Sequence, residues 1–110
     1  MAYGFIEVRG VTTATVALDI MCKTSNVQFV TKEQKLGGRL VTVIIEGEVA
    51  AVKEAIEAAS AHGLNPPVAK GVLASPHPEV RRLVVKSAAK FNVAESKKES
   101  KNDSTEENRP

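Results

Sequence analysis

The chain has no tryptophan, and phenylalanine and tyrosine together make up only 4% of its residues. Cysteine occurs once, at Cys22, so no disulfide can form within the chain, which fits a reducing compartment. The longest apolar run near the middle, Leu40 to Ile45, contains Thr42 and is far too short to cross a bilayer. No basic segment followed by an apolar one opens the sequence, so we expect no signal peptide. These absences predict a cytoplasmic protein without a membrane partner.

The chain also lacks a large excess of either positive or negative charge, because the formal net charge is only +2. A nucleic-acid-binding protein usually carries a strong basic excess or aromatic residues among its lysines and arginines, and neither is present. Cys22, His62 and His77 show no metal-ligand spacing, and the carboxylates are scattered without an acid/base pair. We therefore expect no nucleic-acid partner, no catalytic residue, no metal and no cofactor, and the protein is predicted not to be an enzyme.

What the chain does contain is 43% hydrophobic residues, so its core must consist of alanine, valine, isoleucine and leucine. Such side chains bury little area each, and contacts between subunits would add to stability. The composition changes near Asn92, and residues 95–110 include no apolar side chain that could offset the entropy of ordering. We predict one domain over residues 1–91 and a disordered, dispensable charged tail over residues 92–110.

The hydrophobic pattern predicts four strands and three helices. Gly63 would end the second helix, and Pro66-Pro67 would force an extended entry into the last strand. The order is β-α-β-β-α-β plus a short C-terminal helix, which predicts an α+β, ferredoxin-like domain with an antiparallel sheet covered by helices on one face. The expected strands are Tyr3 to Arg9, Val27 to Thr31, Leu40 to Glu46 and Val68 to Leu73, and the expected helices run from about Thr12 to Lys23, over residues 48–62 and from His77 to Lys90.

Four local features are expected within these elements. Thr12 or Thr13 would cap the first helix, and Cys22 would be a small packed residue on it. A tight turn is predicted from Lys35 to Arg39. On the C-terminal helix, one face would carry Val80, Leu83, Val84 and Ser87. His62 would favour the end of its helix as a cation, and His77 would make a cap or a local contact.

Several spaced segments resemble the bacterial microcompartment shell family. They are Tyr3-Gly-Phe-Ile-Glu-Val-Arg-Gly10, Met21-Cys-Lys-Thr-Ser-Asn-Val27, Lys35-Leu-Gly-Gly-Arg-Leu-Val-Thr-Val43 and Glu46-Gly-Glu-Val-Ala-Ala-Val-Lys53. The resemblance covers about residues 3–80 and leaves out the tail. It implies a homohexamer shaped like a tile, which assembles with other shell proteins and has a pore for small metabolites on its six-fold axis. From the bare backbone amides at Gly38 and the charge of Arg39, we expect this pore to favour small polar or anionic metabolites.

The resemblance also implies roles for particular residues. Gly37, Gly38 and Arg39 would line the pore, with Arg39 standing where the family usually has glycine. Four residues would lie at the edge between neighbouring hexamers: Lys23, Asn26, Ser75 and His77.

Further along, Ala74-Ser75-Pro76-His77 replaces a Pro-Arg-Pro-His segment of many members. Ser75 thus stands in place of an arginine that inserts into the adjacent hexamer. We therefore expect this protein to tile weakly alone. Tiling would then rely on partner shell proteins, or on Arg81 or Arg82 reaching the edge.

Two alternatives remain open from the sequence. Arg39 would either face the axis or turn away to pair with Glu33 or Glu46. In function, the alternative to a shell protein is a ligand-sensing regulator of ferredoxin-like form, which would bind a metabolite between subunits and stay a small oligomer.

Overall fold

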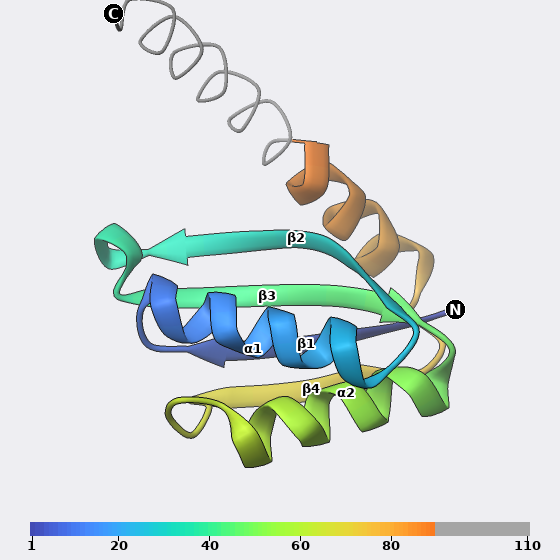
Figure 1. Ribbon diagram of the computed structural model, residues 1–110. Coiled ribbons are helices and arrows are strands. Elements are labelled where there is room, and N and C mark those ends of the chain that lie inside the picture. Colours follow the sequence, from blue (N-terminus) through green and yellow to red (C-terminus); the bar gives the residue numbers. More distant parts are fainter. Residues whose placement is uncertain (90–110) are drawn as a thin grey trace, which may run out of the picture.

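The computed structural model describes residues 1–89, and its element order is the predicted one (Figure 1). The predicted ferredoxin-like α+β fold is therefore confirmed. The predicted tail and its boundary near Asn92 lie outside the described residues. The elements are β1 (Ala2–Val8), α1 (Val11–Thr24), β2 (Val27–Lys35), the 3-10 turn η1 (Leu36–Gly38), β3 (Leu40–Gly47), α2 (Val49–His62), β4 (Ala69–Leu73) and a helix over residues 78–89.

The four strands form one antiparallel sheet in the order β2-β3-β1-β4. At one end of this sheet, Tyr3 lies between Glu46 on β3 and Leu73 on β4. At the other end, Lys35 pairs with Leu40, and η1 joins these two strands. The register therefore places the β2–β3 connection and the segment after β4 at opposite ends of the sheet.

Helices α1 and α2 pack side by side on one face of the sheet and enclose the core (Figure 1). The strand residues that face them are aliphatic and alternate with residues of the other face, as the period of a strand requires. Gly4 lets α2 approach closely, because a Cβ atom there would lie 2.5 Å from Val52 Cγ1. The buried core comprises Ala2, Ile6, Val8, Ala14, Ala17, Met21, Val27, Val41, Val43, Ile45, Val52, Ala55, Ile56 and Ala59.

Helix α1 differs from expectation in two respects. Its N-cap is Gly10, with φ 90° and no side-chain cap, so the expected capping by Thr12 or Thr13 is wrong. Thr13 is instead buried, because its position one turn before Ala17 places it on the inner face of the helix. Cys22 is exposed rather than packed, because its neighbour Met21 takes the inward position of the last turn.

Strand β2 runs four residues beyond the predicted end at Thr31, and a β-bulge lies between Phe29 and Thr31. After the bulge, Thr31 pairs with Ile44, which faces away from α1 and α2. The predicted turn from Lys35 to Arg39 is shorter in the structure, because Lys35 still belongs to the strand.

The helix over residues 78–89 contacts β2 rather than α1 or α2 (Figure 1). Ser87 Oγ lies 3.4 Å from Thr31 Oγ1 and also donates a hydrogen bond to Glu33 Oε1. Val80 and Val84 are half-buried with Ser87, as predicted. Leu83 was wrongly assigned to this face: its side chain is 63% exposed, one residue before the inward-facing position of Val84.

Candidate functional site

The connection between β2 and β3 has an unusual backbone. Leu36, Gly37 and Gly38 all have positive φ angles, of 55°, 66° and 89°. Glycine adopts such angles without steric cost, whereas leucine does not, so the two glycines allow the turn and Leu36 is strained in it. A Cβ atom on Gly38 would lie 3.2 Å from Val11 Cγ2, whereas nothing lies within 4 Å of one on Gly37. The turn thus exposes backbone rather than side chain at Gly37.

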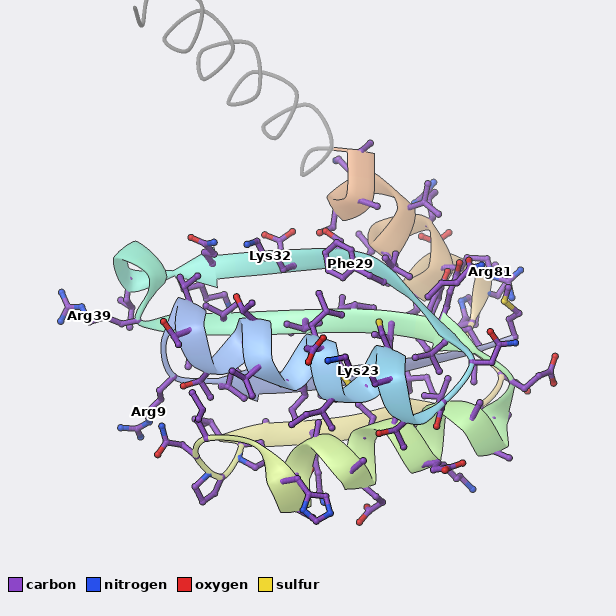
Figure 2. All side chains as sticks on the ribbon, in the orientation of Figure 1. Arg9, Lys23, Phe29, Lys32, Arg39 and Arg81 are labelled. Atoms are coloured by element: carbon purple, nitrogen blue, oxygen red, sulfur yellow. The ribbon has the colours of Figure 1, made fainter. Side chains whose placement is uncertain are left out.

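Arg39 follows this turn and is fixed by its backbone at both ends. Its N–H donates to Leu36 O at 3.3 Å, and its carbonyl oxygen accepts from Gly10 N–H at 3.1 Å. The second bond joins η1 to the start of α1 and brings Arg9 to the same end of the molecule (Figure 2). Both guanidiniums extend outward there. Within residues 1–89, Arg39 makes no ion pair with Glu33 or Glu46, so that pairing is not formed.

A hollow lies between these segments, and Arg9 and Arg39 are its charged members. Arg9 was not singled out from the sequence, where it is only the last residue of an alternating run. Its proximity to Arg39 depends on the β1–β3 register and on the Gly10 hydrogen bond, which no local pattern encodes. The lining residues are Arg9, Gly10, Leu36, Arg39, Leu40 and Val68.

The predicted edge residues Lys23 and Asn26 lie at the opposite end of the sheet from η1. Lys23 is in the last turn of α1, and its Nζ lies 3.0 Å from Asp19 Oδ2. Both side chains are well exposed, so this pair contributes only about 0.3–0.5 kcal/mol and leaves the ammonium available. Asn26 is exposed at the entry to β2 and lines a hollow with Glu46 and Glu48.

Ser75 and His77 belong to the segment between β4 and the last helix, and both are exposed. His77 Nδ1 accepts a hydrogen bond of 3.1 Å from Glu79 N–H, which confirms the expected local contact at a helix start. Since Leu73 pairs with Tyr3, this segment leaves the sheet at the same end as the α1–β2 connection.

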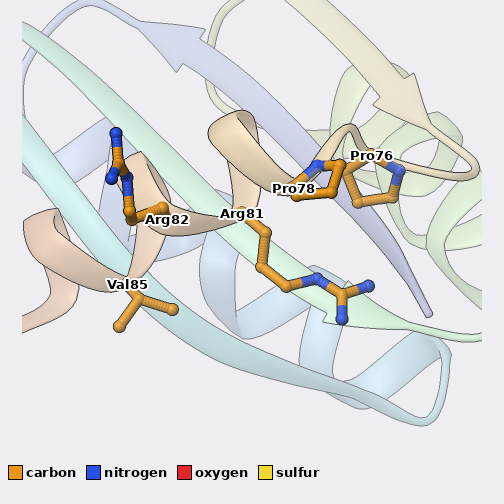
Figure 3. Close-up of a pocket in the computed structure, with 5 residues that line it drawn as sticks. All are labelled: Pro76, Pro78, Arg81, Arg82 and Val85. Atoms are coloured by element: carbon orange, nitrogen blue, oxygen red, sulfur yellow. The ribbon is translucent and has the colours of Figure 1, made fainter.

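Two arginines of the last helix border a hollow together with Pro76, Pro78 and Val85 (Figure 3). Arg82 Nη2 lies 2.6 Å from Glu79 Oε2, so its charge is paired. Arg81 makes no ion pair with any other residue that the structure describes, and its side chain points away from that of Arg82. Of these two arginines, Arg81 is thus the one that is open to an outside partner.

The candidate residues therefore form two groups. Gly37, Gly38 and Arg39 lie at one end of the sheet, and the four predicted edge residues come from two segments at the other. Seven residues of β3 connect the two ends, from Leu40 to Glu46, which corresponds to roughly 20 Å of extended strand.

Nothing in the described part of the chain resembles a metal centre. No three histidine, cysteine or carboxylate side chains lie close enough together to hold a metal ion among residues 1–89. Helices that are long and apolar enough to cross a bilayer are likewise missing from this part. The fold and the two groups of residues define a small α+β domain whose distinctive features face outward from both ends of its sheet.

Comparison with known proteins identifies the family. Residues 2–76 match the model of the BMC domain. The chain is 41% identical over 87 residues to the bacterial microcompartment shell protein PduA of Citrobacter freundii, covering 77% of this chain and 92% of that protein. It is 40% identical over 90 residues to the carboxysome shell protein CsoS1A of Hydrogenovibrio crunogenus, covering 76% and 90% respectively. The chain therefore belongs to the BMC-domain family of microcompartment shell proteins, and this membership supports a structural role in a shell.

A solved structure agrees with this assignment at the level of the fold. A microcompartment protein from Desulfitobacterium hafniense DCB superposes with a TM-score of 0.68 at 23% sequence identity. The match covers 78% of this chain and 47% of the other, so this chain spans about half the length of that protein.

Proposed function

We propose that this protein is a structural, non-enzymatic building block of a bacterial microcompartment shell in the cytoplasm, where it forms cyclic hexamers that tile with partner shell proteins. In each hexamer, Gly37, Gly38 and Arg39 border a central pore. Lys23, Asn26, Ser75 and His77 lie at the outer edge. The observation that carries the proposal is the placement of these two groups at opposite ends of one sheet, in a chain that matches shell proteins over most of its length.

The geometry suits a ring. A subunit of a closed ring needs one end near the axis and the other at the perimeter. At the axial end, η1 presents bare backbone at Gly37, and the adjacent Gly38 also has no side chain. Small residues there leave an aperture, whereas larger side chains would close it.

The charge at this end gives the pore its selectivity. Arg39 is exposed and makes no ion pair within the described residues, so six copies surround the axis with positive potential. The pore therefore admits small polar or anionic metabolites more readily than cations. Salt weakens the effect, because the screening length is about 8 Å at physiological ionic strength.

Tiling at the outer edge depends on cations. Lys23 carries a long stem that can lie along a neighbouring hexamer while its ammonium donates to a carbonyl there. Ser75 cannot insert a guanidinium, and Arg81 on the next helix is the cation available to replace it. We infer that sheets form weakly from this protein alone and more readily with partner shell proteins.

Sedimentation velocity and negative-stain electron microscopy test assembly directly. We expect a hexamer at micromolar concentration and weak sheets that Lys23→Ala abolishes while the hexamer persists. Lys53→Ala removes an exposed lysine from the middle of α2 and serves as the matched control. A monomer or dimer that binds a metabolite would instead support the ligand-sensing regulator.

Ion flux through reconstituted shells tests the pore. Arg39→Gln should lower the anion preference, whereas Arg82→Gln, on the last helix, should leave it unchanged. Equal anion preference in the parent and in Arg39→Gln would remove Arg39 from the selectivity mechanism.

A further inference from the structure

The hollow beside η1 combines two cations with an apolar wall. Arg9 follows β1 and Arg39 precedes β3, and both border the hollow. The hydrogen bond from Gly10 N–H to Arg39 O ties together the two segments that carry them. The spacing of the two arginine backbones is therefore fixed by the fold rather than by a flexible loop.

Charge at this hollow is uncompensated. No carboxylate lines it, and among residues 1–89 neither Arg9 nor Arg39 takes part in an ion pair. Two like charges beside one hollow repel each other, and an anion between them relieves that repulsion. The planar guanidinium matches the geometry of a carboxylate or a phosphate with two parallel hydrogen bonds.

The remaining wall is aliphatic and open to solvent. Leu36 is 69% exposed and Val68 is 48% exposed, and Leu40 completes the surface. Leu36 is held outward by the strained turn in which it lies. Large aliphatic side chains exposed next to unpaired cations fit a ligand that has both an anionic and an apolar part.

We propose that Arg9 and Arg39 together bind a small organic anion with a short aliphatic chain. Its carboxylate lies between the guanidiniums and its chain lies against Leu36 and Val68. This site deepens the proposed pore function, because Arg39 belongs to both, and it assigns Arg9 as a second determinant of anion preference. A metabolite anion would be concentrated on the flank of the aperture before it crosses.

The test is a titration of the full chain with acetate, butyrate and inorganic phosphate, at constant ionic strength. Methyl NMR signals of Leu36 and Val68 report the binding. Butyrate should bind more tightly than acetate, by about two- to fourfold for each methylene that contacts the wall. Arg9→Gln and Arg39→Gln should each weaken butyrate binding by about three- to tenfold. Arg81→Gln, which removes an unpaired arginine from the other end of the sheet, is the matched control and should bind like the parent.

Three outcomes would overturn the site: no saturable shift of the two methyl signals, unchanged butyrate affinity in Arg9→Gln, or phosphate binding as tightly as butyrate. Sedimentation of the same samples keeps this result separate from the proposed function. A hexamer with an anion-selective pore and no saturable binding refutes the site alone, whereas a small oligomer that binds butyrate refutes the ring and leaves the site in place.

Discussion

Gly4→Ala tests whether α2 packs on β1 as closely as the structure requires. The new Cβ atom would lie 2.5 Å from Val52 Cγ1 and 3.2 Å from both Ile45 Cγ1 and Ile56 Cγ1. Carbon atoms in contact are normally about 3.5–4.0 Å apart, so Val52 and the helix that carries it must shift by about 1 Å. All three neighbours of the new methyl group belong to the buried core, where such a shift displaces further side chains.

The magnitude follows from two opposing effects. Overpacking of a core costs about 1–3 kcal/mol. Alanine in a strand interior recovers about 0.5–1 kcal/mol relative to glycine. The expected net loss is about 1.5 kcal/mol in the free energy of unfolding, or roughly 6–12 °C in the midpoint of thermal unfolding for a domain of this size.

Urea denaturation at one fixed protein concentration measures this loss, because any subunit association makes apparent stability depend on concentration. The matched variant is Val52→Ala, which alone should cost about 2 kcal/mol through lost burial. Combined with Gly4→Ala, it removes the clashing atom, so the double variant should be more stable than additivity predicts by at least about 1 kcal/mol. A Gly4→Ala protein as stable as the parent, or strictly additive losses, would refute the close approach of α2 to β1.

Three further substitutions test other contacts. Gly71→Ala places a Cβ atom 2.5 Å from Phe5 Cζ; it should cost about 1 kcal/mol in urea denaturation, and a Phe5→Leu background should remove that cost. Ser87→Ala deletes the contacts with β2; amide exchange should accelerate within residues 78–89 while global stability changes by less than about 1.5 kcal/mol, and unchanged exchange would contradict this docking. Lys23→Ala should change stability by less than about 0.5 kcal/mol, since its pair is exposed; a larger loss would mean that its effect on tiling is not an assembly effect.

The order of the elements could be predicted from the sequence because each has a strong local period. The stripe of Val49, Val52, Ile56 and Ala59 faces the sheet, although Val49 is only partly buried. The alternation from Tyr3 onward gives β1 its two faces. Such periods are set by the geometry of single elements, so they are readable without knowledge of the tertiary structure.

The predictions that were wrong concern features that depend on contacts between elements. Thr12 and Thr13 are good capping residues, but the Gly10 carbonyl accepts the first helical hydrogen bond, from Ala14 N–H. The extension of β2 to Lys35 depends on pairing with β3, because Glu33, Gln34 and Lys35 carry no strand signal of their own. Arg9 was missed for the same reason, since only the register brings it beside Arg39.

The bulge in β2 determines which side chains beyond it face the last helix and which face the core. Side chains alternate along a strand, so one extra residue exchanges the two faces for everything beyond it. With the bulge, Thr31 and Glu33 meet Ser87, while Lys32 and Gln34 lie on the side of Val43 and Val41.

Deleting Val30 would leave this assignment in place, because Phe29 opposite Ile45 and Thr31 opposite Ile44 would then be consecutive residues of a regular strand. If the full sequence paired with β3 without a bulge, Lys32 would instead face the last helix, Glu33 would face α1, and β2 would end one residue earlier. The one extra residue thus determines both which side chains of β2 meet the last helix and where β2 ends before η1.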